Sequence, residues 1–108
     1  MSTYNPDGWV IVKITYDEKV GYRIFADWAG SYLYGASWKL SSGITDIVEE
    51  DEEYVITNYS GSVYYCRKTA QGRLGSFGMS VLKNAQDEHG EENFAVVDIK
   101  EVNLGSVA

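Results

Sequence analysis

Apolar and polar residues alternate along the first part of the chain. The stretch "GWVIVKITYDEKVGYRIFADW", residues 8–28, carries four residues on one face of its first half: Val10, Val12, Ile14 and Tyr16. A period of two is typical of a β-strand with one buried face. A polar break at residues 17–19 separates this pattern from a second alternating run, so the sequence predicts a hairpin.

Strand patterns continue through the middle of the chain. Residues 32–40, "YLYGASWKL", predict a third strand, in which Gly35 marks a bulge or a close approach of two backbones. Residues 44–59 predict two short strands joined by an acidic run, and "VYYCRK" at 63–68 predicts a sixth after the turn "YSGS". Six short strands in succession favour an antiparallel meander or a small barrel.

One segment has helical spacing instead. After "GRLG", Ser76 is the expected N-cap, and four apolar residues fall on one helical face: Phe77, Val81, Leu82 and Ala85. Gly90 is expected to end this helix, with His89 near the negative end of its dipole. Residues 93–104 then predict a last strand.

These elements predict an α+β fold that is mostly β, with about six to seven short strands and one helix in the C-terminal half. The 108 residues make one domain by length, and an apolar fraction of 44% is that of a folded protein. We expect a single domain over residues 1–108, with residues 1–7 and 104–108 frayed.

The charge balance bears on the partners. Sixteen Asp and Glu residues stand against nine Lys and Arg, which gives a net charge of -7. This opposes direct binding to a nucleic-acid backbone, because affinity there comes mainly from Lys and Arg that displace counterions. A partner protein with a basic surface suits the chain better.

Three features predict a soluble, cytoplasmic protein without membrane association. No apolar run approaches the roughly 18 to 20 residues needed to span a bilayer. The start, "MSTYNPDGW", lacks the basic and apolar regions of a secretory signal. Cys66 is the only cysteine, which excludes an internal disulfide and fits a reducing compartment.

Cys66 is the first candidate for chemistry, because a nucleophilic thiol needs a nearby base and an electropositive setting. Arg67 follows it directly, but neighbours along a strand point to opposite faces. His89 is the only histidine, and nothing in the sequence places it near Cys66. A small buried strand residue is therefore the favoured interpretation, and we expect no catalytic residue.

The glycine-rich stretch "GRLGSFG" is the second candidate. Glycines before a helix let the backbone approach an anion, and the helix dipole favours negative charge. The candidate ligand-binding set adds two cations to this loop: Arg67, Gly72, Arg73, Gly75 and Ser76. The spacing fits neither the dinucleotide fingerprint nor the Walker loop, so an ordinary turn before a helix remains the alternative.

Acidic runs and tyrosines form the third candidate. The stretches 49–53 and 87–92 lack the alternating ligands of a calcium loop, so we expect solvated turns with no metal and no cofactor. The first run could instead attract a basic protein surface, or mimic nucleic-acid phosphates. With two tyrosines, it gives the candidate protein-binding set: Glu49, Glu50, Asp51, Glu52, Glu53, Tyr59 and Tyr65.

The middle of the chain also carries a recognisable pattern. Its first part is Trp38, Leu40, Ser42, Gly43 and Ile44, and its second is Ser60, Gly61, Ser62, Val63, Tyr64 and Cys66. Over residues 38–82 the chain resembles small accessory proteins of tailed bacteriophages, which share a W-x-L-x-S-G-I opening, an acidic turn and a Y-S-G-S-V-Y-x-C block. No activity is attached to this pattern. The resemblance implies an accessory protein acting in the bacterial cytoplasm during infection.

Two functions follow as hypotheses. The first is a non-enzymatic protein that binds and inhibits a host protein, either a defence nuclease or transcription machinery, through the acidic run and exposed tyrosines. The second is a small-ligand binder that sequesters a nucleotide or cyclic nucleotide at Gly72–Ser76. A homodimer is a further expectation, since a meander leaves open sheet edges.

Overall fold

The central hairpin forms as predicted. The structure, a computed structural model, describes residues 2–31 and 35–104, and in it β2 (Gly8–Tyr16) pairs antiparallel with β3 (Lys19–Ser31). Asp17 and Glu18 make the turn with φ of 50° and 66°. Two residues with positive φ match the right-handed twist of a hairpin, so the turn supports the strands that it joins.

The first half of β2 is buried on both of its faces, from Gly8 to Val12. Successive side chains of a strand point to opposite sides. Trp9 and Ile11 accordingly belong to one apolar cluster, and Val10 and Val12 to another. Two further layers must therefore cover this hairpin, one on each side.

Sheet 1 adds one strand to each side of the hairpin, in the order β4-β3-β2-β8, with β4 at Gly35–Leu40 and β8 at Phe94–Val97. The expected third strand is confirmed from Gly35 onward, and its residues 32–34 lie outside the described residues. Gly35 does make a close approach, because a Cβ atom on Gly30 would overlap its carbonyl oxygen. The register shift lies on the partner strand, between Trp28 and Ser31.

The last strand is shorter than the predicted 93–104. It ends at Val97 because Asp98 begins a short 3₁₀ helix, η2 (Ile99–Glu101). The Asp98 carboxylate accepts a hydrogen bond from the Lys100 amide, and the Glu101 carboxylate accepts one from the Asp98 amide. This reciprocal cap stops the strand.

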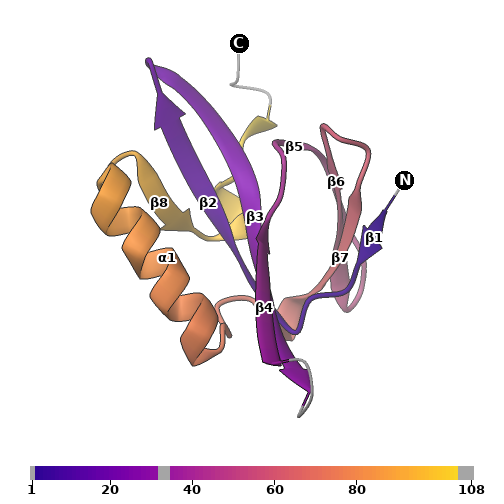
Figure 1. Ribbon diagram of the computed structural model, residues 1–108. Helices are drawn as coiled ribbons and strands as arrows, with labels where there is room; N and C mark the ends of the chain where they lie inside the picture. The colour runs from indigo at the N-terminus through magenta and orange to yellow at the C-terminus, as the bar shows by residue number, and fades with distance from the viewer. Residues whose placement is uncertain (1, 32–34, 105–108) are drawn as a thin grey trace.

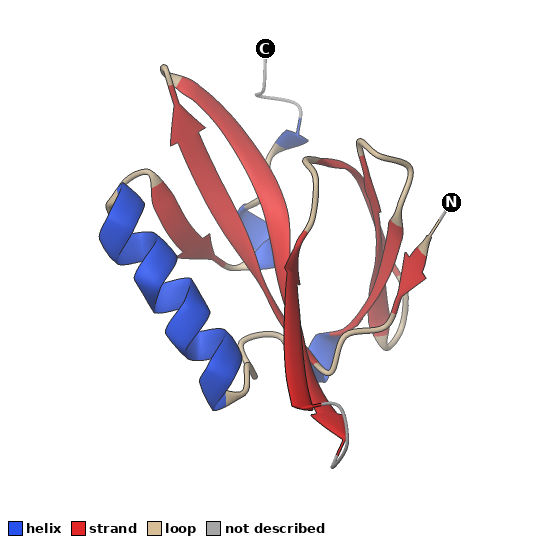
Figure 2. Cartoon of the chain, in the orientation of Figure 1, coloured by secondary structure: helices blue, strands red, loops and turns tan. Residues whose placement is uncertain are grey.

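Sheet 2 holds the next three predicted strands and has the order β1-β7-β6-β5. Its strands β5 (Ile44–Glu49), β6 (Glu53–Asn58) and β7 (Val63–Arg67) form a meander, as predicted. The chain crosses from sheet 1 to sheet 2 at Ser41, whose buried hydroxyl oxygen accepts a hydrogen bond from the Ile24 amide at 2.8 Å. The fold is α+β and mostly β, as Figure 2 shows.

The N-terminal segment was expected to be frayed, but its residues 3–6 make specific contacts. Strand β1 (Thr3–Tyr4) pairs in parallel with β7, with Thr3 beside Val63. The Tyr4 ring stacks on the Tyr64 ring at 4.8 Å between centroids, and Pro6 is buried. These contacts order residues 3–6. Of the C-terminal residues expected to fray, Leu104 packs against the core, and 105–108 lie outside the described residues.

The protein has three layers, with α1 (Ser76–His89), sheet 1 and sheet 2 from left to right in Figure 1. Between the sheets lies the larger apolar cluster, which contains Trp9, Ile11, Ile24, Ile56 and Cys66. Between sheet 1 and the helix lies the smaller one, which contains Val10, Val12, Phe25, Leu82 and Phe94. The outer face of sheet 2 is the one sheet face over which no described element lies.

The helix follows the prediction with two corrections. Gly90 ends it, with φ of 84°, as expected. Its N-cap is Gly75 rather than Ser76, and the cap has no side-chain hydrogen bond. Phe77 is 49% exposed, while Gly78 is buried in its place against Asp27 of β3. Helical spacing favours the large apolar residue, but the carboxylate leaves room only for glycine.

The Gly78→Ala substitution tests this contact, because its expected effect on the free energy of unfolding has the opposite sign to the usual effect of Gly→Ala in a helix. Alanine in a helix is normally about 1 kcal/mol more favourable than glycine. At Gly78 the added Cβ would lie 2.5 Å from Asp27 Oδ2. Since the helix must move away, we expect the free energy of unfolding to fall by about 1–2 kcal/mol. Urea unfolding measures it, with Ser80→Ala as the exposed helical control; a stabilised Gly78→Ala variant would contradict the packing.

Candidate functional site

The acidic run forms the turn between β5 and β6, as predicted. The turn is closed by a hydrogen bond from the Glu50 amide to the Glu53 carbonyl at 2.8 Å. Four side chains of the run line one shallow depression: Glu50, Asp51, Glu52 and Glu53. These four residues are called the acidic turn. Their carboxylates have no ion-pair partner among the described residues.

Glu49 differs from the acidic turn because a lysine neutralises it. Lys68 starts a short 3₁₀ helix, η1 (Lys68–Ala70), and its Nζ lies 2.7 Å from Glu49 Oε2 and 5.3 Å from the centre of the Tyr54 ring. The hydrogen bond and the charge of Lys68 lower the pKa of Glu49, and Glu49 in turn raises the pKa of Lys68. Both groups are surface groups, so this pair orients the turn more than it stabilises the fold.

The outer face of sheet 2 carries an apolar row next to the acidic turn. Val48, Val55 and Tyr65 are direct neighbours across β5, β6 and β7. Val48 is 50% exposed, and Val55 and Tyr65 are partly exposed. The next residue pair on this face toward the turn is Glu53 and Arg67. The sheet therefore brings Tyr65 and the acidic turn together on one surface.

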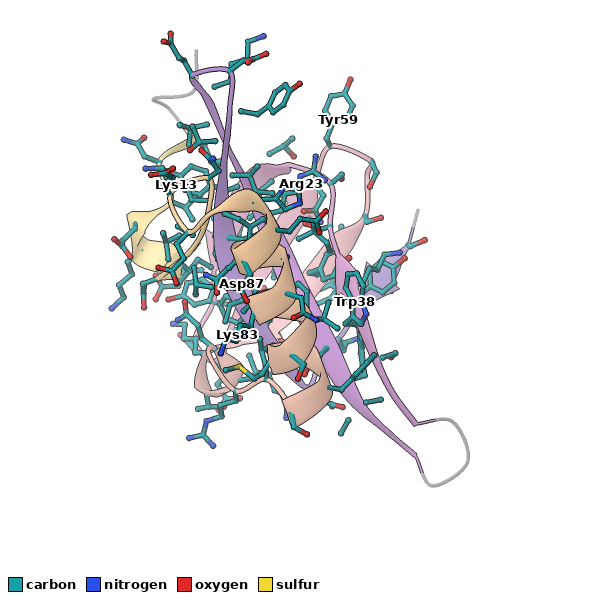
Figure 3. All side chains as sticks on the ribbon, turned by 60° about the vertical axis from the view of Figure 1, so that its left-hand side comes forward. Lys13, Arg23, Trp38, Tyr59, Lys83 and Asp87 are labelled. Atoms are coloured by element: carbon teal, nitrogen blue, oxygen red, sulfur yellow. The ribbon has the colours of Figure 1, made fainter. Side chains whose placement is uncertain are left out.

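Tyr59 does not belong to that surface. It lies in the turn between β6 and β7, whereas the acidic turn precedes β6. Six residues at roughly 3.3 Å each place the two about 20 Å apart. The side chain of Tyr59 is 86% exposed and stands at the same end of the molecule as Arg23 (Figure 3). The predicted protein-binding residues thus divide between two ends of sheet 2.

The glycine-rich loop already holds an anion, which is a carboxylate of the protein itself. Asp27 Oδ2 accepts a hydrogen bond from the Gly75 amide at 2.7 Å, at the start of α1. The Gly72 amide donates to the Trp9 carbonyl, and the Arg73 amide to the Ala70 carbonyl. The amides of Gly72, Arg73 and Gly75 therefore bond within the protein.

The predicted ligand-binding set is also divided in space. Arg67 shares the outer face of sheet 2 with Tyr65, because they are two positions apart on one strand. Arg73 is exposed in the loop before α1, and Ser76 is exposed at the first turn of the helix. At Gly72–Ser76, where an anion site was expected, the Gly75 amide already donates to the Asp27 carboxylate.

Cys66 is a packing residue. Its side chain is fully buried between the sheets, beside Tyr64. Burial raises the pKa of its thiol to about 12, and the charge of Glu53 adds to the rise. His89 lies at the far end of α1, where its ring faces Phe94 at 6.2 Å between centroids. The two residues form no nucleophile and base pair.

Comparisons with protein-family models, with curated proteins and with solved structures found no match to this chain. In residues 2–31 and 35–104, no three His, Cys, Asp or Glu side chains gather in a way that could hold a metal ion. The described helices include none with the length and apolar character that crossing a membrane requires. Function is therefore inferred from the surfaces of the molecule.

Sequence reasoning missed Asp27, Val48 and Val55. The strand "RIFADWA" placed Asp27 opposite the core-facing residues, but only the packed helix makes that side an interior. Val48 and Val55 alternate with the core residues Ile47 and Ile56. Apolar residues on both faces of a strand next to an acidic turn were the available signal.

The native Cys66 thiol should resist modification. With a pKa of about 12, about one thiol in ten thousand is ionised at pH 8, and burial denies access. We expect no reaction with an aromatic disulfide reagent at pH 8 on the minute scale, and full reaction in 6 M guanidinium chloride. Ser80→Cys supplies an exposed control thiol on the same protein; equal native rates for Cys66 and for this introduced thiol would disprove the buried position.

Asp27 should give the protein a distinct dependence of stability on pH. Burial raises the pKa of its carboxyl above the ordinary 3.8, the hydrogen bond from Gly75 opposes the rise, and the charge of Asp7 adds to it. A raised folded pKa means that folding takes up a proton. The stabilisation that comes from this proton uptake is therefore fully present below pH 3.8, and it is lost as the pH rises through the folded pKa of Asp27.

Asp27→Asn removes this titration and keeps the shape of the side chain. The free energy of unfolding of the wild type relative to this variant should decline from about pH 4 upward, and then level off. Urea unfolding of both proteins at a series of pH values measures the difference. A difference that increases with pH over this interval would mean that the Gly75 hydrogen bond outweighs burial.

Proposed function

We propose that this protein is a non-enzymatic accessory protein that binds a host bacterial protein with a basic surface and inhibits it. One observation carries the proposal. No described element covers the outer face of sheet 2, and its apolar row of Val48, Val55 and Tyr65 adjoins the acidic turn. Apolar contact area and concentrated negative charge are thus available to one partner at once.

This arrangement has the chemistry of a protein interface. Interfaces combine an apolar centre with a polar rim, and tyrosine is enriched in them because it offers rigid area with a polar tip. Carboxylates at the rim speed the encounter with a basic partner and select against acidic ones. Since Lys68 neutralises Glu49, the recognition charge comes from Glu50–Glu53.

The resemblance to accessory proteins of tailed bacteriophages suggests the type of partner. It favours a host enzyme, either a defence nuclease or a component of the transcription machinery. Both kinds of enzyme have basic surfaces for nucleic acid, and the acidic turn would then mimic the phosphates. A binding role is also supported by the chemistry of Cys66, whose buried thiol of high pKa is unsuited to nucleophilic attack.

Charge-matched variants test the surface. One variant neutralises the acidic turn, with Glu50, Glu52 and Glu53 changed to Gln and Asp51 changed to Asn. Its control neutralises an equal number of exposed carboxylates around the end of α1: Asp87, Glu88, Glu91 and Glu92. Both variants change the net charge by the same amount. A partner is first captured from bacterial lysate, identified and purified.

Calorimetric titration of the purified partner then measures the dissociation constant. We expect the acidic-turn variant and Tyr65→Ala each to weaken binding about tenfold or more, and the control to stay within about threefold. Wild-type binding should weaken with added salt, because the charges are exposed. Equal losses for both charge variants, or binding that is indifferent to Tyr65→Ala, would contradict an interface on sheet 2.

A further inference from the structure

A groove opens at the end of the molecule opposite the acidic turn. It lies between the start of β3, the start of β5 and the turn that carries Tyr59, and Leu104 forms its remaining wall. Its volume is about 550 Å³. Binding sites for small molecules commonly have volumes of roughly 300–1,000 Å³.

The interior of the groove is apolar and open. Tyr22 and Ile44 are buried residues of the core between the sheets, and their sides line the groove together with Leu104. Gly21 and Gly43 also line it, and a Cβ atom added to either glycine would meet no atom within 4 Å. The two glycines therefore leave free space where side chains would otherwise stand.

Tyr59 stands at the rim of the groove on a backbone that hydrogen bonds hold in place. Its amide donates to the Gly43 carbonyl at 2.7 Å, and the Ser60 amide donates to the Ser42 hydroxyl oxygen at 3.1 Å. The hydroxyls of Ser42, Ser60 and Ser62 continue this network. A ring that is 86% exposed on a fixed turn is accessible to a second ring that stacks on it.

Among the described residues that line the groove, Arg23 is the only charged one. Its Nη1 lies 3.5 Å from the Ser41 carbonyl oxygen, a long hydrogen bond that leaves the other guanidinium donors available. No carboxylate pairs with it in the described part of this acidic chain. Guanidinium groups bind phosphate and carboxylate through two parallel hydrogen bonds, so a ligand in this groove should be anionic.

We propose that this groove binds a small ligand in which a planar ring is joined to an anionic group. The ring stacks on Tyr59, and the anion bonds to Arg23. A nucleoside monophosphate has this chemistry. Figure 3 shows the two side chains at one end of the molecule, from β3 and from the turn after β6. The site is independent of the surface on sheet 2.

Three probes separate the parts of the ligand: AMP, adenosine and inorganic phosphate. Titrations followed by ¹H–¹⁵N correlation spectra should show saturable binding of AMP with a dissociation constant below about 1 mM. Shifts should centre on residues 21–23, 42–45 and 59. Adenosine and phosphate should each bind at least about tenfold more weakly than AMP, because each lacks one of the two contacts.

Two variants and two matched controls complete the test. Tyr59→Ala and Arg23→Gln should each weaken AMP binding about tenfold or more. Tyr16→Ala removes another highly exposed tyrosine, and Arg73→Gln another exposed arginine, and both should leave the binding unchanged. The proposal is overturned if AMP gives no saturable shifts up to several times this concentration, or if the controls weaken binding as much as the groove variants. Neither result would contradict the proposed interface on sheet 2.

Discussion

Burial of the β2–β3 hairpin on both faces places every other layer of the protein. Trp9 and Ile11 on one side and Val10 and Val12 on the other cannot both be covered by one sheet or one helix. The meander of sheet 2 covers the first pair, and α1 covers the second. Because sheet 2 uses its inner face for this purpose, its outer face has no covering layer in the described part of the chain. The candidate interface is therefore a result of the layer order (Figure 1).

Asp27 fixes the position of the helix within this order. Its carboxylate projects from a strand of sheet 1, accepts the Gly75 amide and meets the Cα of Gly78. An isolated helix start attracts anions from solvent through free amides and the dipole. Here the chain provides the anion, and the contact that anchors α1 engages the Gly75 amide. Burial of the Asp27 carboxyl group weakens this anchor, because burial disfavours the charged form. The same burial raises the pKa of the carboxyl group.

Local patterns in the sequence predicted the elements that depend on local burial. The hairpin, the meander and the end of α1 at Gly90 follow from alternation, turn residues and a glycine stop. The pairing of β8 with β2 and of β1 with β7 left no local trace, because contacts between distant segments are not encoded in the period of either one. The N-cap and Phe77 were misplaced because helical spacing cannot register Asp27, which comes from another element.

The candidate interface and the groove could be predicted only in part, for the same reason. The acidic run and Tyr65 could be placed on one surface only after the register of β5, β6 and β7 was known. Tyr59 lies six residues from Glu53, and strand geometry alone would have separated it from the acidic turn. Arg23 and Gly43 are twenty positions apart in the chain, so their groove has no sequence signature.

The parallel pairing of β1 with β7 has a consequence for the order of folding. Thr3 finds its partner Val63 sixty positions later, whereas β5, β6 and β7 are joined by short turns. Closing a loop of that length costs more entropy than closing a turn, so we expect the meander of sheet 2 to form before β1 docks. On the ribosome, β7 has not yet been made when β1 emerges. Strand β1 can therefore dock only after β7 has been made, and it then covers part of the β7 edge.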